Sequence, residues 1–127
     1  MGRPMAANLQ LAGHELRVHD TRREAAAALV AGGAVWADGP AQAASGVEVL
    51  FTCLPGPEEV EAVALGDGGL LGAMEAGSVW FDLTTNAPDR VRRLSATFAA
   101  RGVRLLDAPV SGGPKGAQSR RLALWVG

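Results

Sequence analysis

Short apolar runs alternate along this chain with longer segments in which hydrophobic residues recur at helical spacing. The clearest run covers residues 47–53, where Glu48 is the only charged residue. Runs of this length, bounded by glycine and proline, indicate buried strands. The predicted strands are residues 15–19, 34–37, 47–53, 79–82, 103–106 and 122–126. The predicted helices are residues 4–11, 21–31, a brief helix that begins at Pro40, and residues 58–65, 70–74 and 88–100.

The order of these elements predicts the fold class. Strand and helix alternate throughout, which is typical of right-handed βαβ units around a parallel sheet. We therefore expect an α/β fold with a doubly wound parallel sheet, in one domain because no linker, repeat or low-complexity tract divides the chain. The last strand follows a short connection, so we expect it to extend the sheet in the antiparallel direction.

Capping signals predict where two of the helices begin. Thr21 and Glu24 have the spacing of a capping box, and Gly32 ends the helix that this box would open. Asn86 is expected to cap the helix that begins at Pro88.

Composition excludes several classes of function. The chain has 12 basic and 13 acidic residues and a net charge of −1, so no electrostatic argument favours a nucleic acid or an anionic membrane as partner. Cys53 is the only cysteine, which excludes an internal disulfide and favours the cytoplasm. No apolar run is long enough to span a membrane, and the first residues do not resemble a signal peptide. His14, His19 and Cys53 lack the spacing of metal ligands, so no metal site is expected.

The segment from Asp107 to Gly113 is the strongest candidate for a binding site. It follows a predicted strand, and ligands of open parallel sheets bind beyond the carboxyl ends of the strands. Ser111 offers a hydroxyl, while Gly112 and Gly113 leave backbone N–H groups open to approach, a combination that suits a small carboxylate. The alternative is a tight turn in which Ser111 is a local cap. Ser111 is not expected to be a nucleophile, because neither histidine is placed as its base.

Residues near the start of the chain extend this interpretation. Met1-Gly2, Met5, Ala6 and Asn8 match the second half of a dinucleotide-binding fingerprint. Together with the Asp-Ala-Pro-Val-Ser-Gly-Gly segment, they resemble the β-hydroxyacid dehydrogenase family, which includes 3-hydroxyisobutyrate dehydrogenase. The resemblance implies a Rossmann-like fold whose first strand and first two glycines would precede Met1. Residues 1–127 would then be a partial NAD(P)-binding domain without the helical catalytic and dimerisation domain of the family.

The same resemblance assigns cofactor-binding residues. Gly2 and Met1 would belong to the pyrophosphate loop, and Leu54 with Pro55 would line the adenosine side. Thr85 would approach the nicotinamide. Asp20 lies 18 residues beyond Gly2, near the spacing at which an acid accepts the ribose hydroxyls. We therefore expect NAD as cofactor, with NADP as the alternative because two arginines follow closely; Asp20 as a simple cap of the next helix is the competing interpretation.

The family's chemistry is hydride transfer between a nicotinamide and a small 3-hydroxy acid or its semialdehyde. The resemblance places the acid–base lysine in the helical domain, so no catalytic residue is expected in this chain, and the chain alone is expected to be inactive. Lys115 is not a substitute by position. The intact enzyme is expected to bind a small hydroxy acid and to form a homo-oligomer. The alternative is a catalytically silent dinucleotide-binding or interaction module. One departure from the family is Arg120-Arg121, where relatives usually have Gly-Thr, which is expected to disturb the local turn.

Overall fold

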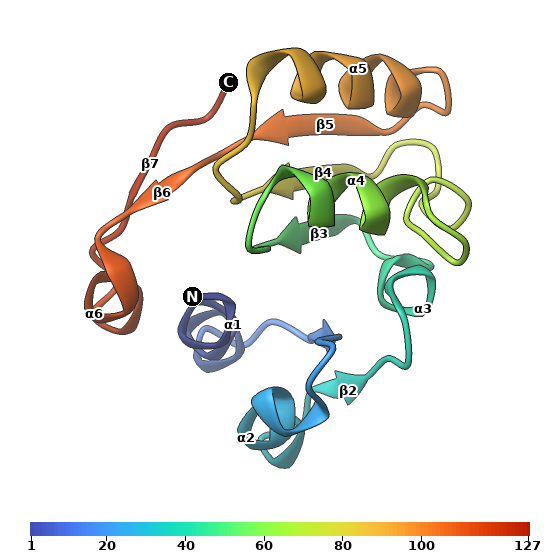
Figure 1. Cartoon of the computed structure of the whole chain (residues 1–127). Helices are drawn as coiled ribbons and strands as arrows, with labels where there is room; N and C mark the ends of the chain where they lie inside the picture. Colours follow the sequence, from blue (N-terminus) through green and yellow to red (C-terminus); the bar gives the residue numbers. More distant parts are fainter.

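The computed structural model describes all 127 residues as alternating short strands and helices (Figure 1). The strands are β1 (Arg17–Val18), β2 (Val35–Trp36), β3 (Val49–Thr52), β4 (Val79–Asp82), β5 (Arg104–Asp107), β6 (Val110–Ser111) and β7 (Ala123–Leu124). The helices are α1 (Gly2–Leu11), the 3-10 helix η1 (Arg23–Ala26), α2 (Ala27–Ala31), α3 (Pro40–Ala44), α4 (Pro57–Leu65), α5 (Pro88–Ala99) and α6 (Gly113–Gln118).

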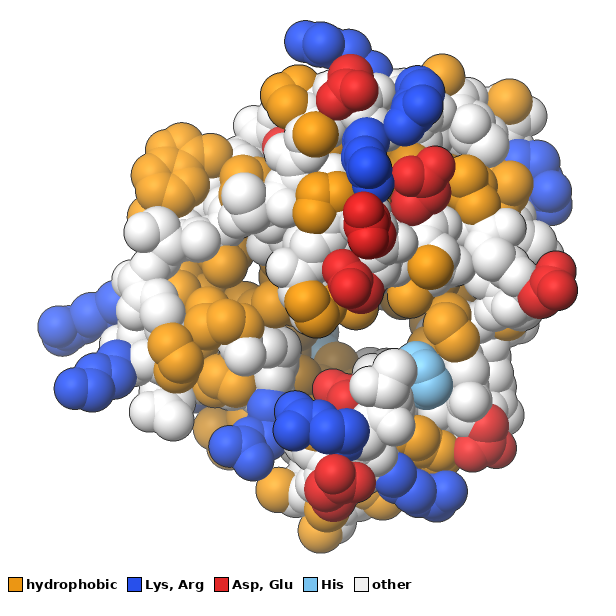
Figure 2. Space-filling model, viewed as in Figure 1, with side chains coloured by type: hydrophobic (Ala, Val, Ile, Leu, Met, Phe, Trp, Pro, Cys, Tyr) orange, Lys and Arg blue, Asp and Glu red, His pale blue; other side chains and the backbone are white.

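The predicted parallel α/β architecture is confirmed. Strands β3, β4 and β5 form a three-stranded parallel sheet, and β1 pairs with β2 in a second parallel sheet. The two parallel sheets are not joined, because β1 and β3 make no ladder with one another. Figure 2 shows an opening between the part of the molecule around β3 and the part around α1 and α2. The strands are therefore parallel within each of these two sheets, which do not form one continuous sheet.

The hydrophobic core lies between the β3–β5 sheet and the helices α4 and α5, which lie along that sheet in Figure 1. Trp80 from the central strand is fully buried, and its ring packs at 4.9 Å from the ring of Phe98 on α5. By contrast, α1 buries none of its residues completely, although it lies beside α2 and α6. The core cluster comprises Ala44, Val60, Ala64, Leu70, Met74, Trp80, Leu94, Phe98, Val103 and Leu105.

Two predictions about helices are wrong. Residues 70–74 form a turn rather than a helix, with the backbone N–H of Met74 donating to the carbonyl of Leu70. Leu70 and Met74 are both buried, so their helix-like spacing reflects two contacts with the core and not a continuous helix. The capping box at Thr21 and Glu24 is also absent, because the segment opens as η1 at Arg23 without a side-chain cap.

The C-terminal segment folds differently from expectation. The last strand is antiparallel, as predicted, but β7 pairs with β6 and so forms a separate ribbon rather than an extension of the main sheet. Neither β6 nor α6 was predicted. Arg120, which was expected to disturb the turn before β7, adopts φ 60 there, and its Nε donates to Asn8 Oδ1 at 3.1 Å. The arginine thus accepts a left-handed backbone conformation and gains a contact with α1.

Candidate functional site

The candidate site lies along the edge at which the parallel strands end. Thr52, Asp82 and Asp107 are the last residues of β3, β4 and β5, and they stand side by side in the ladder register. Figure 1 shows the three arrowheads pointing to the same side. The loops that follow these strands therefore begin from one line, which is where an open parallel sheet places its ligand.

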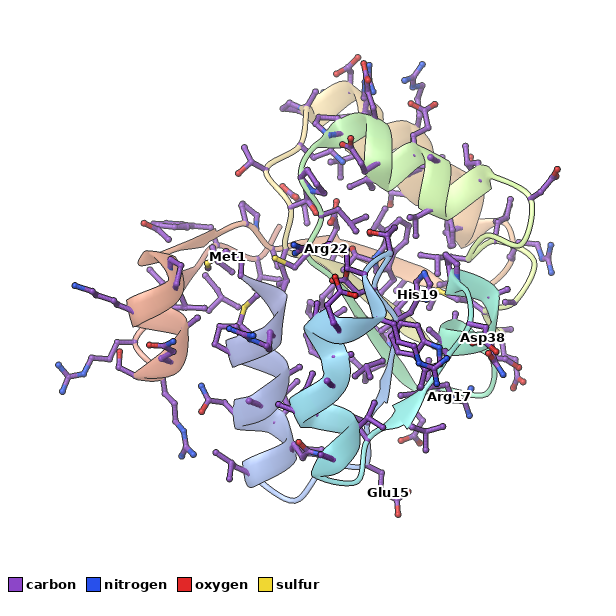
Figure 3. The ribbon with its side chains drawn as sticks, turned by 60° about the horizontal axis from the view of Figure 1, so that its bottom comes forward. Met1, Glu15, Arg17, His19, Arg22 and Asp38 are labelled. Carbon is purple, nitrogen blue, oxygen red and sulfur yellow. The ribbon has the colours of Figure 1, made fainter.

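Helix α1 begins at this same edge. A Cβ added to Gly2 would lie 3.7 Å from the Cβ of Cys53, directly after β3. In Figure 3, Glu15, Arg17, His19 and Arg22 follow one another along the β1 segment toward the level of Met1. Gly2 therefore lies at the strand-end edge, beside the residue that follows β3. Burial raises the pKa of the neighbouring Cys53 thiol, as expected for an unreactive cysteine.

A buried carboxylate connects the loops after β3 and β4. Asp82 is 2% exposed, and its Oδ1 accepts hydrogen bonds from Thr52 Oγ1 at 2.9 Å and from the Thr84 N–H at 3.1 Å. Thr84 Oγ1 in turn accepts the Leu54 N–H at 3.0 Å. The Leu54 turn is thus fixed by Thr84, a residue that sequence reasoning left without a role. The sequence feature that could have indicated this polar network is Asp82 itself, a charged residue at the end of the apolar run at residues 79–82.

Asn86 lies close to the start of α5 but does not cap it. The N-cap of α5 is Ala87, with no side-chain cap, so the predicted Asn86 cap is wrong. Asn86 Oδ1 instead accepts the Ala87 N–H at 2.8 Å, while Asn86 Nδ2 donates to Asp82 Oδ2 at 3.3 Å. Thr85 is exposed. Its hydroxyl is therefore accessible to a ligand at the strand-end edge.

The Ser111–Gly113 segment links β6 to α6. Ser111 is exposed on β6, and Gly112 and Gly113 have φ values of 125 and 59. Glycine adopts positive φ at the least cost, so the backbone conformation favours glycine at both positions. This segment is held near the start of the chain because α6 lies against α1, where Asn8 Nδ2 donates to the Ala117 carbonyl at 2.6 Å. Asn8 of the fingerprint therefore has a structural role.

Asp20 accepts a hydrogen bond within its own turn but does not cap the next helix, because η1 begins at Arg23 without a side-chain cap. Its Oδ1 accepts the backbone N–H of Arg22 at 2.9 Å, while the side chain stays exposed. One of the two neighbouring arginines is engaged elsewhere: Arg23 lies 5.1 Å from the ring centroid of Trp36 and 3.9 Å from Asp38. Arg22 makes no such contact, so it is the arginine that remains available beside Asp20.

Asp107 occupies a less favourable environment than Asp82. Its Oδ1 is buried without a hydrogen-bond partner, although the residue as a whole is partly exposed. Burial raises the pKa of the Asp107 carboxyl, and the neighbouring Asp82 charge adds to the shift. Folding therefore makes the Asp107 carboxyl a weaker acid than it is in the unfolded chain.

Asp107→Asn is expected to raise the melting temperature at pH 7 by more than it does at pH 4. A raised folded-state pKa gives stability that is complete below the unfolded-state pKa and is lost as the pH rises through the folded-state pKa. The asparagine side chain of the variant carries no charge, so the variant avoids the loss of folding stability that the wild-type chain undergoes at neutral pH. Thermal unfolding of both proteins at the two pH values measures the difference. Asp67→Asn, at an exposed loop position, is the control; an equal gain at both pH values would contradict the explanation.

No group of three or more His, Cys, Asp or Glu side chains is arranged to hold a metal ion. None of the helices combines the length and the apolar character needed to cross a membrane.

Parallel βαβ units, a helix beginning at the strand-end edge and a glycine-containing segment beyond β5 together define a dinucleotide-binding domain of the Rossmann type. Residues 1–127 match the family described as the NAD binding domain of 6-phosphogluconate dehydrogenase, and the chain belongs to this family. The predicted NAD(P)-binding class is thereby confirmed.

Individual relatives agree with this membership. The chain is 44% identical to a 3-hydroxyisobutyrate dehydrogenase and 41% identical to an NAD-dependent L-serine dehydrogenase, both of Pseudomonas aeruginosa, over 127 residues in each case. It also resembles the solved structure of Mycobacterium tuberculosis 3-hydroxyisobutyrate dehydrogenase with L-serine, with a TM-score of 0.92 and 35% identity. In all three cases the whole chain is covered, but it spans only 43% of the relative's length.

Proposed function

We propose that this chain is the cofactor-binding part of an NAD-dependent oxidoreductase that acts on a small 3-hydroxy acid or its semialdehyde. The observation that carries the proposal is the convergence of Gly2, the Leu54 turn and the loop after β4 at one strand-end edge. The enzymes to which the chain is similar include dehydrogenases of hydroxyisobutyrate and L-serine, which both carry a carboxylate and a hydroxyl.

In this proposal the cofactor lies across the strand-end edge. Met1 and Gly2 approach the pyrophosphate, since glycine allows close approach of the backbone at the start of a helix. Leu54 and Pro55 line the adenosine side, and Thr85 approaches the nicotinamide with its exposed hydroxyl. Asp20 uses the carboxylate oxygen that is not engaged by the Arg22 N–H to accept a ribose hydroxyl.

The substrate carboxylate is assigned to Ser111, Gly112 and Gly113. The Ser111 hydroxyl is exposed, and the two glycines present backbone without side chains beside it. Bound NAD supplies the acceptor for the hydride that leaves the alcohol carbon. The residues of this chain orient the cofactor and the acid, while the acid–base lysine that the family resemblance implies would come from a helical domain outside these 127 residues. The chain by itself is therefore expected to bind NADH without turning over a hydroxy acid.

Cofactor titration tests this proposal and the preference for NAD. Wild-type chain is expected to bind NADH more tightly than NADPH, because the Asp20 carboxylate repels a 2′-phosphate. Asp20→Asn should reduce that preference by roughly tenfold, since an amide can still accept the Arg22 N–H but carries no charge. Dissociation constants from NMR titration with each cofactor measure the effect.

The Glu24→Gln variant is the matched control, because Glu24 is an exposed acid in the same segment. If Asp20→Asn leaves the ratio of the two dissociation constants unchanged, Asp20 is only a turn cap. If neither cofactor binds the wild-type chain, the proposed function fails.

Two further statements belong to the proposal. The intact enzyme is expected to be a homo-oligomer, as the resemblance to the family implies. It is expected to work in the cytoplasm, which the single cysteine favours.

A further inference from the structure

The Asp82 side chain makes the largest number of buried polar contacts in the chain, and the proposed function gives this residue no role. Asp82 is 2% exposed, and three donors meet its carboxylate. The donors are Thr52 Oγ1 and the Thr84 N–H at Oδ1, and Asn86 Nδ2 at Oδ2. None of these donors is a cation. Such a buried carboxylate is costly unless its hydrogen bonds serve the structure around it.

Two of these donors, Thr84 and Asn86, lie in the loop after β4, and the third, Thr52, is the last residue of β3. Thr84 extends the network to the turn after β3 by accepting the Leu54 N–H, and Asn86 extends it toward α5 by accepting the Ala87 N–H. On the core side, Trp80 Nε1 donates to Thr52 Oγ1 at 2.8 Å. One carboxylate therefore connects the loop assigned to adenosine, the loop assigned to nicotinamide and the centre of the core.

We propose that Asp82 is a positioning residue for the dinucleotide, whose carboxylate holds the Leu54–Pro55 turn and the Thr84–Asn86 loop at a fixed separation. The inference rests on the proposed function, because that function assigns both loops to cofactor binding. Asp82 itself is buried and does not touch the ligand. Its loss should weaken NADH binding through the two loops.

Asp82→Asn tests the positioning role separately from any role in the core. The substitution replaces one carboxylate oxygen, which is an acceptor, by an amide nitrogen, which is a donor. The amide oxygen still accepts from Thr52 and Thr84, whereas the amide nitrogen faces Asn86 Nδ2, another donor. Turning the Asn86 amide would remove the acceptor of the Ala87 N–H. We therefore expect the variant to leave the packing of the core unchanged and to lose the hydrogen bonds that hold the loop after β4. NADH binding is expected to weaken about tenfold, which corresponds to one charge-assisted hydrogen bond.

The experiment is a ¹⁵N-resolved NMR titration of the 127-residue chain with NADH, for wild type, Asp82→Asn and the control Asp89→Asn. Asp89 is an exposed acid in the first turn of α5. The Trp80 indole N–H resonance reports the core, and the Thr84 and Ala87 amides report the loop. We expect an unchanged indole resonance, altered loop amides and a roughly tenfold higher dissociation constant for Asp82→Asn alone.

A dissociation constant for Asp82→Asn equal to that of wild type would overturn the inference, since a merely structural role alters stability and leaves the affinity of the folded chain unchanged. If Asp82→Asn does not fold, Thr84→Val decides the question, because it removes only the acceptor of the Leu54 N–H. Weaker NADH binding by folded Thr84→Val supports the inference, and unchanged binding overturns it. Failure of the proposed function is seen separately, as a wild-type chain whose resonances do not respond to NADH.

Discussion

Ser111→Ala is expected to reduce kcat/KM for the hydroxy acid by roughly 10- to 150-fold in the intact enzyme, with little change in NADH affinity. A hydroxyl that donates to a carboxylate contributes about 1.5–3 kcal/mol. Ser111 is exposed on β6, so its loss should not disturb the core. The NADH affinity should stay because the cofactor is assigned to the ends of β3 and β4. Steady-state kinetics together with an NADH titration measure both quantities.

Two further variants sharpen this prediction. Ser119→Ala is the matched control, since Ser119 is an exposed serine at the end of α6 that bonds only to backbone carbonyls of that helix. Gly113→Val should be more damaging than Ser111→Ala, because a branched side chain is strained at φ 59 and also covers the backbone that the ligand must approach. Weaker NADH binding with normal hydroxy-acid kinetics in Ser111→Ala would show that this segment does not bind the substrate.

Trp80→Ala is expected to lower the free energy of unfolding by about 3–5 kcal/mol, the largest stability effect of any single substitution proposed for this chain. Trp80 is fully buried in the central strand, packs on Phe98 and donates its indole N–H to Thr52. Truncation leaves a cavity between the sheet and α5, and it also leaves the Thr52 hydroxyl without its donor. Chemical denaturation followed by circular dichroism measures the change.

Trp80→Phe is the milder change, because it keeps an aromatic ring against Phe98 while it removes the indole N–H and part of the buried ring volume. It should cost about 1–2 kcal/mol. Trp125→Ala is the control, since Trp125 is 60% exposed and should contribute little. A loss for Trp80→Ala no larger than that for Trp125→Ala would mean that the sheet is not stabilised by this packing.

The hydrophobic pattern predicted the elements that are long or strongly apolar. The strand at residues 79–82 has the predicted bounds, and the helices near residues 4–11, 58–65 and 88–100 differ from the predicted bounds by only one or two residues. Most errors fall on short segments, and the predicted helix at residues 21–31 begins instead as η1 at Arg23. Residues 70–74 look helical because two buried side chains recur at helical spacing, although neighbouring glycines keep the chain in a turn. Strand β6 and helix α6 were missed because a proline and several glycines conceal any periodicity there.

The sequence by itself determined the class of the protein, because alternation of strand and helix, a glycine at the start of the first helix and a Ser-Gly-Gly segment after a strand are local features. It could not determine which side chains the sheet brings together. Thr52, Asp82 and Asp107 are 25 or more residues apart and become neighbours only through the strand register. The tertiary structure alone therefore decided that Asp82 ties two loops together, that Asp107 is left with an unsatisfied oxygen, and that Trp36 and Asp38 engage Arg23 but not Arg22. The physical reason is that burial and hydrogen-bond partners depend on contacts between distant segments, which no local pattern encodes.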